Sequence, residues 1–298
     1  MDRLEDQVIV IVGGSSGIGK ECALLFAKQG ANILLIARGR ERLQEVVGEI
    51  HSKGGKAQEF PADVTSRDDV RQISRQIESQ FGRVDILIYG AAAFYLSSVE
   101  MMDIDLAKQT MEVNYWGAVH IIQAFLPLIR KSQCKSIVLI SSLSVPCTPP
   151  FFTAYAATKH ALRGLALSLR QELRTEGIRV QLIAPGPVDT PLIENYLYQE
   201  MYRLPRGIPV LQPKIAAQKI FKAVNRRKQE VVIPKRMGLA ARLAYAFPSL
   251  VESYYHLSIP DWSQAIHTQI EKQRHDTYEP HLTPVKPNPT AKTSELEE

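Results

Sequence analysis

Several features that mark specialised classes of protein are scarce in this sequence of 298 residues. Its three cysteines, Cys22, Cys134 and Cys147, are odd in number and far apart, which argues against a disulfide framework or a thiolate metal site. The seven histidines show no metal-ligand spacing. No apolar run approaches the ~20 residues of a transmembrane helix, and strand-like residues from Val8 onward leave no room for a signal peptide. We therefore expect a soluble, cytoplasmic protein without a bound metal.

The composition is that of a globular protein with a sizeable core, since 45% of the residues are hydrophobic and 22% are charged. The formal net charge of +5 is unevenly placed: residues 200–242 hold eleven Lys or Arg and two Glu. Such a cluster suits phosphates, acidic partners or an anionic membrane, or it is simply a solvated helix face. Stacking aromatics do not accompany these basic residues, so nucleic acid is not the predicted partner.

A glycine-rich turn near the N-terminus carries the first functional signal. Residues 8–12 form a β-branched run typical of a buried parallel strand, and residues 13–19 (GGSSGIG) follow it directly. An apolar helical pattern then runs to Gly30, and residues 33–37 are predicted as a second strand. A strand, a glycine turn, a helix and a strand form a unit whose helix N-terminus can bind a pyrophosphate. The alternative is a plain tight turn.

The end of the second predicted strand indicates which dinucleotide would bind. An acidic residue at this place holds the ribose hydroxyl of NAD, whereas an arginine accommodates the phosphate of NADP. The chain has Ala37 and Arg38 here, followed by Arg40 and Arg42. NADP(H) is therefore favoured over NAD(H), unless these arginines merely line the start of a helix.

Strands and helices alternate along most of the chain. Further strands are predicted at residues 57–62, 85–89, 137–140, 180–183 and 231–233, separated by helical patterns at 43–52, 67–81, 105–129, 153–174 and 213–227. This alternation predicts an α/β fold with a doubly wound parallel sheet, a Rossmann-type three-layer α/β/α domain. We expect that single domain at residues 1–235, a C-terminal amphipathic helical extension at 236–279 and a disordered tail at 280–298.

Polar residues that follow different strands should meet at one edge of this sheet, because the carboxyl ends of parallel strands lie together. Tyr155 and Lys159 are four apart, on one face of a predicted helix. An ammonium beside a phenol favours the phenolate, so we expect the pair to give a tyrosine that titrates near working pH. Ser142, at a strand end, is placed to donate to an oxygen above that tyrosine.

The ordered motifs resemble those of the short-chain dehydrogenase/reductase family, specifically its compact single-domain oxidoreductase branch. They are Gly13-x-x-x-Gly17-Ile18-Gly19, Asp63-Val64, Asn114, Ser142, Tyr155-x-x-x-Lys159 and Pro185-Gly186-x-Val188-x-Thr190. The resemblance covers roughly residues 7–235. It implies a hydride-transferring enzyme that acts on CH–OH groups or the corresponding carbonyls.

The resemblance also implies a role for each matching residue. Tyr155 would be the general acid, Lys159 would lower its pKa and bind the nicotinamide ribose, and Ser142 would hydrogen-bond the substrate oxygen. Asn114 would hold a water that connects Lys159 to solvent. The expected catalytic residues are Asn114, Ser142, Tyr155 and Lys159, of which Ser142 and Tyr155 also bind substrate. The expected cofactor-binding residues are Gly13, Ser15, Ser16, Gly17, Ile18, Gly19, Arg38, Asp63, Val64, Ala91, Asn114, Tyr155, Lys159, Pro185, Gly186, Val188 and Thr190.

The chain departs from the family pattern at two places. Val12 replaces the usual Thr, which removes a hydroxyl beside the glycine turn. Residues 89–92 are Tyr-Gly-Ala-Ala where the family usually has Asn-Asn-Ala-Gly. This second change motivates an alternative function, a catalytically quiet NADP-binding regulatory protein. Epimerase-type chemistry, which uses the same Tyr and Lys, is a third hypothesis that the glycine spacing disfavours.

The segments expected over the nicotinamide are apolar, so the predicted substrate is a lipophilic ketone, aldehyde or secondary alcohol, such as an acyl chain or sterol-like compound. They include Phe94, Tyr95, Leu96, Leu143, Val145, Pro146, Phe151, Phe152 and a predicted lid with Leu192, Ile193, Tyr196, Leu197, Tyr198, Met201 and Tyr202.

Apolar residues at 239, 243, 246 and 247 share one helical stripe beside basic residues. This predicts either peripheral membrane contact through residues 235–257 or an extra helix packed on the domain or on a partner subunit. We also expect a homo-oligomer, with the long helices at 105–129 and 153–174 as its interface.

Overall fold

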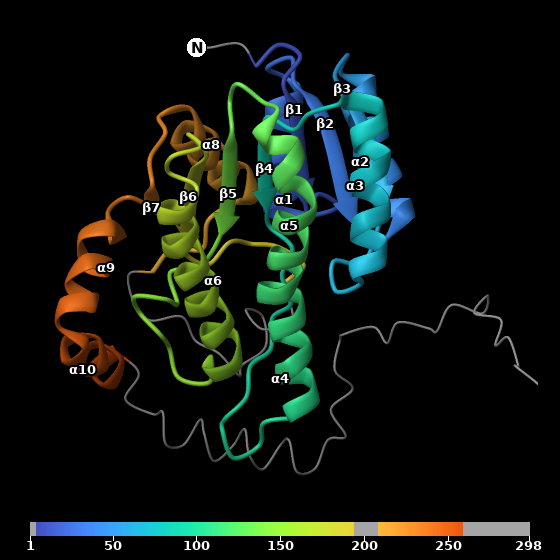
Figure 1. Ribbon diagram of the computed structural model, residues 1–298. Helices are drawn as coiled ribbons and strands as arrows, with labels where there is room; N and C mark the ends of the chain where they lie inside the picture. Colours follow the sequence, from blue (N-terminus) through green and yellow to red (C-terminus); the bar gives the residue numbers. More distant parts are fainter. Residues whose placement is uncertain (1–3, 194–207, 259–298) are drawn as a thin grey trace, which may run out of the picture. The chain divides into compact units, whose positions relative to one another are not determined.

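A seven-stranded sheet forms the centre of the computed structural model, which describes residues 4–193 and 208–258 (Figure 1). All neighbouring strands are parallel, in the order β3-β2-β1-β4-β5-β6-β7. The strands are β1 (Val8–Val12), β2 (Asn32–Ala37), β3 (Lys56–Pro61), β4 (Ile86–Tyr89), β5 (Ser136–Ile140), β6 (Arg179–Pro185) and β7 (Glu230–Ile233). The strand order reverses between β1 and β4, and a doubly wound sheet binds its ligands at such a switch point.

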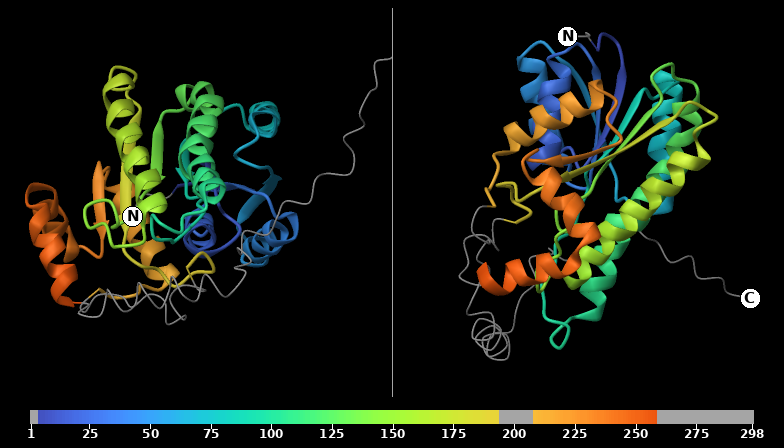
Figure 2. Two further views of the ribbon diagram at one scale, coloured as in Figure 1. Left: turned by 90° about the horizontal axis from the view of Figure 1, so that it is seen from below. Right: turned by 90° about the vertical axis from the view of Figure 1, so that its left-hand side faces the viewer.

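Helices cover both faces of the sheet, as the alternating pattern predicts (Figures 1 and 2). The helical segments are α1 (Gly17–Ala27), α2 (Arg40–Ser52), α3 (Arg67–Phe81), α4 (Ile104–Met111), η1 (Glu112–Trp116), α5 (Gly117–Arg130), α6 (Thr153–Glu172), α8 (Pro213–Asn225), α9 (Met237–Ala246) and α10 (Pro248–Ser258). The predicted three-layer α/β/α arrangement is thus confirmed.

The sequence of β1 shows why two separate cores form. Successive side chains of a strand point to opposite faces of the sheet. Val8, Val10 and Val12 accordingly pack with α3, α5 and α6, whereas Ile9 and Ile11 pack with α1, α2 and α8. Every residue of β1 is buried. A strand that is apolar on both faces is stable only in the middle of such a sandwich.

The single helix predicted at residues 105–129 contains an irregular turn. A π-helical segment, η1, separates α4 from α5 and carries Asn114. The buried Tyr89 hydroxyl donates a hydrogen bond of 2.5 Å to the Val113 carbonyl within this turn. The side chain of Tyr89 also lies against Gly117, where an added Cβ would be 2.5 Å from the hydroxyl oxygen. Tyr89 therefore replaces a bond that the regular helical ladder loses at the π turn.

The two C-terminal helices begin directly after the last strand. The described residues belong to one compact unit, and α9 contacts β7. Ala241, Ala244 and Tyr255 are buried, while the stripe predicted around Leu239 and Leu243 faces outward. In the described part of the chain, none of the helices has the length and apolar character needed to cross a bilayer. The boundaries predicted at 235 and 279 stay predictions, and the predicted tail at 280–298 lies outside the described residues.

Candidate functional site

The glycine turn after β1 is compact because its backbone segments touch one another. Gly13 has φ of +81°, a conformation that favours glycine. A Cβ on Gly13 would lie 2.7 Å from the amide nitrogen of Ala91, and a Cβ on Gly19 would lie 2.1 Å from the Gly13 carbonyl oxygen. At Gly17, a Cβ would lie 2.9 Å from the Thr190 side chain. The turn therefore brings the ends of β1, β4 and β6 into contact, with the N-terminus of α1 above them.

Val12, one of the two departures, does not disturb this turn. Its side chain is fully buried in the core, and its carbonyl accepts a hydrogen bond of 2.9 Å from the Gly90 amide. The Gly13 amide donates to the Ile36 carbonyl at 2.8 Å. Backbone hydrogen bonds to both neighbouring strands thus hold the turn without the hydroxyl.

Arginines gather where β2 ends. Arg38, Arg40 and Arg42 are exposed, and the guanidinium of Arg42 lies next to Gly39. Within residues 4–193 and 208–258, none of the three forms an ion pair with a carboxylate. Their charges therefore remain available for an anionic ligand at this strand end.

Asp63 and Val64 follow β3 and are held in a fixed turn. The Asp63 carboxylate accepts hydrogen bonds from the Thr65 amide at 2.9 Å and from the Thr65 hydroxyl at 2.8 Å, both through the same oxygen. Val64 is buried, and its carbonyl lies 3.0 Å from a ring nitrogen of His120 on α5. Only one carboxylate oxygen of Asp63 is used in this turn.

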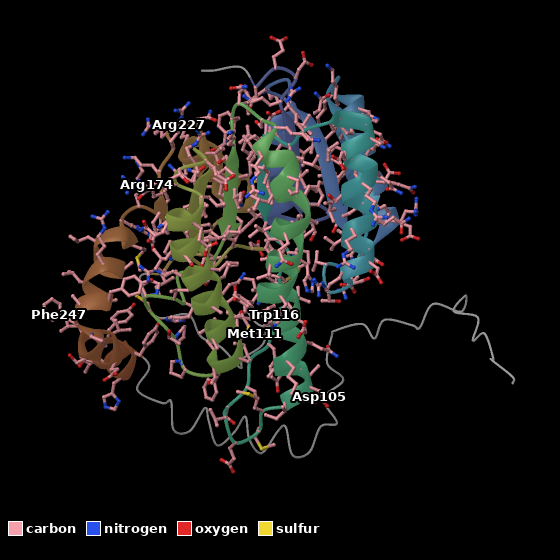
Figure 3. All side chains as sticks on the ribbon, viewed as in Figure 1. Asp105, Met111, Trp116, Arg174, Arg227 and Phe247 are labelled. Atoms are coloured by element: carbon pink, nitrogen blue, oxygen red, sulfur yellow. The ribbon has the colours of Figure 1, made fainter. Side chains whose placement is uncertain are left out.

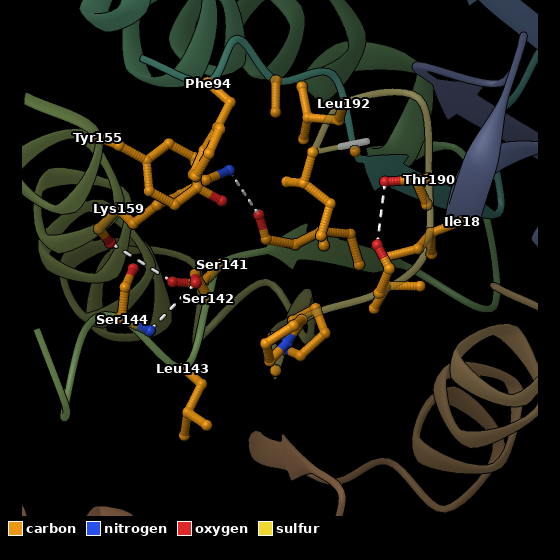
Figure 4. A pocket seen from close by; sticks show the side chains of 18 of the residues that line it. Ile18, Phe94, Ser141, Ser142, Leu143, Ser144, Tyr155, Lys159, Thr190 and Leu192 are labelled. Atoms are coloured by element: carbon orange, nitrogen blue, oxygen red, sulfur yellow. Dashed lines mark hydrogen bonds between the residues drawn. The ribbon is translucent and has the colours of Figure 1, made fainter. Parts of the chain in front are cut away.

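Tyr155, Lys159 and Ser142 meet at the floor of a pocket, as the sequence predicts (Figure 4). Tyr155 and Lys159 are one turn apart on α6, and the Lys159 Nζ atom lies 5.5 Å from the centre of the Tyr155 ring. Lys159 is 2% exposed and donates to the Ile140 carbonyl at 3.2 Å. The Ser142 hydroxyl accepts from the Ser144 amide at 3.1 Å, which fixes the turn after β5.

The pKa values of this pair differ from the expectation of a tyrosine that titrates near working pH. Burial raises the pKa of Tyr155 to about 12, and its hydrogen bond with Ser142 lowers that value only in part. Burial also lowers the pKa of Lys159 to about 8. Removal from water is the main cause of both shifts. At neutral pH the tyrosine is a protonated phenol, poised to donate rather than to accept a proton.

Asn114 lies in η1, and every polar group of its side chain has a protein partner. Its amide nitrogen donates to the Ala93 carbonyl and to the Thr158 hydroxyl, each at 2.9 Å. Its oxygen accepts from the Ala93 amide at 2.7 Å. Asn114 is fully buried, so it ties the segment after β4 to α6 at the residue before Lys159. Both amide protons are used in these bonds, whereas the oxygen accepts one bond and can accept a second, so the predicted contact with a water stays a prediction.

The pocket is apolar around a small polar floor. The pocket together with the open solvent at its mouth spans about 1190 Å³. Phe94 stacks edge-on against Tyr155, with ring centres 4.6 Å apart, and Phe152 lies 6.1 Å from the same ring. The predicted site residues that line this pocket are Ile18, Gly19, Ser142, Tyr155, Lys159, Pro185, Gly186, Val188 and Thr190. The predicted site residues outside its lining are Gly13, Ser15, Ser16, Gly17, Arg38, Asp63, Val64, Ala91 and Asn114.

Some pocket residues were not predicted from the sequence. Tyr255 reaches the lining from α10, and Cys147 and Ser144 come from the loop after Ser142. The Ser144 hydroxyl is buried and has no hydrogen-bond partner among the described atoms. No motif marks Tyr255; the spacing of apolar residues in 250–257 was the only sequence signal. The predicted lid residues 196–202 lie outside the described residues, whereas Leu192 and Ile193 do line the pocket.

The described residues contain no group of three or more side chains suited to a metal ion. A doubly wound parallel sheet with a glycine turn at its switch point defines a Rossmann-type α/β protein. Within that class, a family model described as short chain dehydrogenase matches residues 7–200. The chain belongs to the short-chain dehydrogenase/reductase family, as its motifs indicated, and this is an oxidoreductase family that uses NAD(P)(H) and acts on small molecules.

Known relatives match most of the chain. Dehydrogenase/reductase SDR family member 7B of Danio rerio is 34% identical over 243 residues, which cover 78% of each protein. A fatty acyl-CoA reductase of Acinetobacter baylyi is 34% identical over 247 residues, or 82% of this chain and 81% of the relative.

Solved structures share the fold. A dehydrogenase/reductase from Sinorhizobium meliloti 1021 has a TM-score of 0.69 at 25% identity, covering 77% of this chain and 94% of that one. A short-chain type dehydrogenase/reductase from Mycobacterium ulcerans has a TM-score of 0.68 at 22% identity, covering 77% and 88%; this likeness concerns the fold alone.

Proposed function

We propose that this protein is an NADP-dependent carbonyl reductase or alcohol dehydrogenase that transfers hydride between NADP(H) and a lipophilic ketone, aldehyde or secondary alcohol. The observation that carries the proposal is the meeting of Ser142, Tyr155 and Lys159 on the floor of an apolar pocket that opens at the strand ends. A proton donor, a hydrogen-bond donor and a buried amine surround one place where a carbonyl oxygen can lie.

Tyr155 supplies the proton in the direction of reduction. As the carbonyl carbon receives hydride, negative charge develops on the oxygen. The Tyr155 phenol, with its pKa raised to about 12, is protonated at neutral pH and donates its proton to that oxygen. The Ser142 hydroxyl donates a hydrogen bond to the same oxygen and stabilises the charge before the proton arrives. The product is an alcohol, and Tyr155 is left as a phenolate.

Lys159 and Asn114 support this step. In the ammonium form, Lys159 favours the phenolate through its charge. One of its N–H groups donates to the Ile140 carbonyl, and its other N–H groups are suited to ribose hydroxyls. Asn114 positions Lys159 through Thr158, the preceding residue on α6. A water bound near Asn114 could donate to the second lone pair of the side-chain oxygen, since both amide protons are already used.

Two observations support the binding of a dinucleotide. First, the turn at Gly13 and Gly19 is so tight that a Cβ atom at either glycine would collide with neighbouring backbone. This turn lies at the N-terminus of α1, which favours a pyrophosphate. The carboxylate of Asp63 has a second oxygen for an adenine amino group. When bound, the nicotinamide supplies or accepts the hydride. Arg38, exposed and free of ion pairs among the described residues, supports the preference for the phosphate of NADP(H).

The apolar lining supports a lipophilic substrate. Phe94 and Phe152 pack against the Tyr155 ring and Leu143 lines the same pocket, so an alkyl or acyl chain would replace water on these surfaces. One relative is named fatty acyl-CoA reductase, and this name supports the proposal that the substrate is a long-chain carbonyl compound.

The surface supports two further proposals about partners. We propose a cytoplasmic protein with peripheral membrane contact through residues 235–257. Leu239, Phe247 and Leu250 support this contact, since they are 69%, 54% and 59% exposed. Figure 3 shows Phe247 at the outer side of the C-terminal helices. We also propose a homo-oligomer whose interface includes η1 and α6. Trp116 of η1 and Leu167 of α6 are 44% and 39% exposed and would be covered by a partner subunit. Light scattering tests the oligomer; a purely monomeric species at micromolar concentration contradicts it.

The test of the enzyme proposal compares the wild type with Tyr155→Phe. We expect the wild type to oxidise NADPH with members of a panel of long-chain aldehydes and ketones. Tyr155→Phe should lower kcat by about a thousandfold, since general acid catalysis contributes factors of roughly a hundred to ten thousand, while NADPH binding is kept. If the wild type binds NADPH but reduces no member of the panel, the result supports the alternative, a catalytically quiet NADP-binding protein.

A further inference from the structure

The last described helix contributes to the pocket wall through one residue. Tyr255 on α10 is 6% exposed and lines the pocket. Its neighbours Tyr254 and Leu257 are 38% and 79% exposed, so α10 turns one narrow face inward. The match to the family model ends at residue 200, so Tyr255 lies beyond the matched segment.

Tyr255 is anchored to the loop that carries the substrate-side residues. Its hydroxyl donates a hydrogen bond of 3.0 Å to the Cys147 carbonyl. The amide of Cys147 donates to the Leu143 carbonyl at 3.2 Å, and the amide of Val145 donates to the Ser142 carbonyl at the same distance. The first two bonds connect α10 to Leu143, the residue next to Ser142, and the third closes the turn at Ser142. The hydroxyl of Tyr255 therefore braces the turn on which Ser142 stands.

The ring of Tyr255 has a second consequence, which is steric. Leu143, Pro149 and Phe152 line the same pocket and come from the segment between β5 and α6. Among the described residues of α10, Tyr255 is the one that lines this pocket. A buried aromatic ring at that place limits how far a chain bound above Tyr155 can extend toward the C-terminal helices.

We propose that Tyr255 determines which chain lengths the pocket accepts: its ring closes the far wall and its hydroxyl holds the Ser142 loop. The inference rests on the proposed function, because it specifies the lipophilic substrate of that same pocket. Tyr255 acts as a specificity-determining residue and takes no part in proton transfer.

Three variants test the proposal: Tyr255→Ala, Tyr255→Phe and, as a control, His256→Ala at the exposed neighbouring position. The ratio of kcat/KM for dodecanal to that for hexanal is measured with NADPH. Tyr255→Ala should raise this ratio by about tenfold, since pocket size discriminates chain length by factors of this order. Tyr255→Phe should keep the ratio and lower kcat/KM for both aldehydes by about fivefold, the effect of one lost hydrogen bond. His256→Ala should match the wild type.

A purely structural role for Tyr255 would lower both kcat/KM values in Tyr255→Ala equally and leave the ratio unchanged, which overturns the proposal. If Tyr255→Ala does not fold, Tyr255→Leu keeps an apolar buried side chain and should still shift the ratio. If the wild type turns over neither aldehyde, the proposed function fails, and the role of Tyr255 is then tested by calorimetric binding of dodecanol and hexanol. Tyr255→Ala should increase the affinity for dodecanol more than the affinity for hexanol. An equal increase for both alcohols contradicts the inference.

Discussion

At the scale of single residues, burial governs the chemistry of the site more than charge pairing does. The sequence places Tyr155 and Lys159 one turn apart, and this spacing is confirmed. The sequence could not reveal that both groups are almost completely removed from water, because burial depends on Phe94, Phe152 and the strand ends that surround them. Desolvation therefore moves the two pKa values in opposite directions.

The pH dependence of catalysis follows from these shifts. Below the pKa of about 8, Lys159 carries its charge; above it the amine is neutral and no longer favours the phenolate that each reduction leaves behind. We expect kcat/KM for reduction to be level near pH 7 and to fall about tenfold per pH unit well above the pKa of Lys159. The pKa of Tyr155, about 12, lies too high to cause this fall.

Lys159→Arg provides the matched control for this pH profile. A guanidinium stays charged throughout, so the variant should be less active but should lack the alkaline fall. A wild-type profile that stays level to about pH 10 would remove Lys159 from the proton-transfer step.

The cofactor preference is also decided by single side chains. Arg38→Ala removes the charge proposed to meet the NADP phosphate, so NADPH affinity should fall by about ten- to a hundredfold, the worth of one or two charge-assisted hydrogen bonds. NADH affinity should change by less than about twofold, because NADH lacks that phosphate. Fluorescence titration with both nucleotides measures this. A wild type that prefers NADH would contradict the assignment.

At the scale of elements, the order of strands and helices followed from the sequence because β-branched runs, glycine turns and apolar stripes are local signals. The π turn was not predictable from helix periodicity. It depends on a contact between Tyr89 and Val113, which come from different elements. The same contact gives the departure at residue 89 a structural reason: a tyrosine there reaches the turn that carries Asn114.

The glycine turn offers a matched pair of glycine substitutions. Gly19→Ala would place a Cβ 2.1 Å from the Gly13 carbonyl oxygen, so the turn must open. We expect a loss of about 2 kcal/mol in the free energy of unfolding, typical of overpacking, together with weaker NADPH binding. Gly48→Ala in α2 meets nothing within 4 Å and should stabilise the protein by about 1 kcal/mol. Chemical denaturation with and without NADPH compares them. Unchanged nucleotide binding in Gly19→Ala would contradict the placement of the pyrophosphate.

At the scale of the whole molecule, the outward face of α9 and α10 needs an explanation, because large apolar side chains and exposed basic residues occupy it together. The sequence predicted this stripe correctly, yet it left open whether the helices pack on the domain or face outward. The structure shows both: Ala241 and Ala244 pack inward while Leu239 and Phe247 face solvent. Such a surface suits an anionic bilayer, which would also supply lipophilic substrate.

Flotation with vesicles that contain phosphatidylserine tests this surface. The wild type should float with the vesicles. The double variant Leu239→Glu with Phe247→Glu should reduce the bound fraction about tenfold, because two exposed apolar groups that would enter the bilayer are replaced by charges that an anionic lipid repels. Ile215→Glu, at a position of α8 that is 41% exposed, is the control and should float like the wild type. A wild type that stays at the bottom of the gradient rejects membrane contact.

The central claim is hydride transfer to a carbonyl carbon beside Tyr155, and isotope tracing measures it most directly. The wild type is incubated with dodecanal and NADPH that carries deuterium at one or the other face of the nicotinamide carbon, and dodecanol is analysed by mass spectrometry. We expect one deuterium in the alcohol from one labelled form only, and almost no alcohol with Tyr155→Phe. NADPH consumption without deuterium in the alcohol, or equal alcohol formation by Tyr155→Phe, would contradict it.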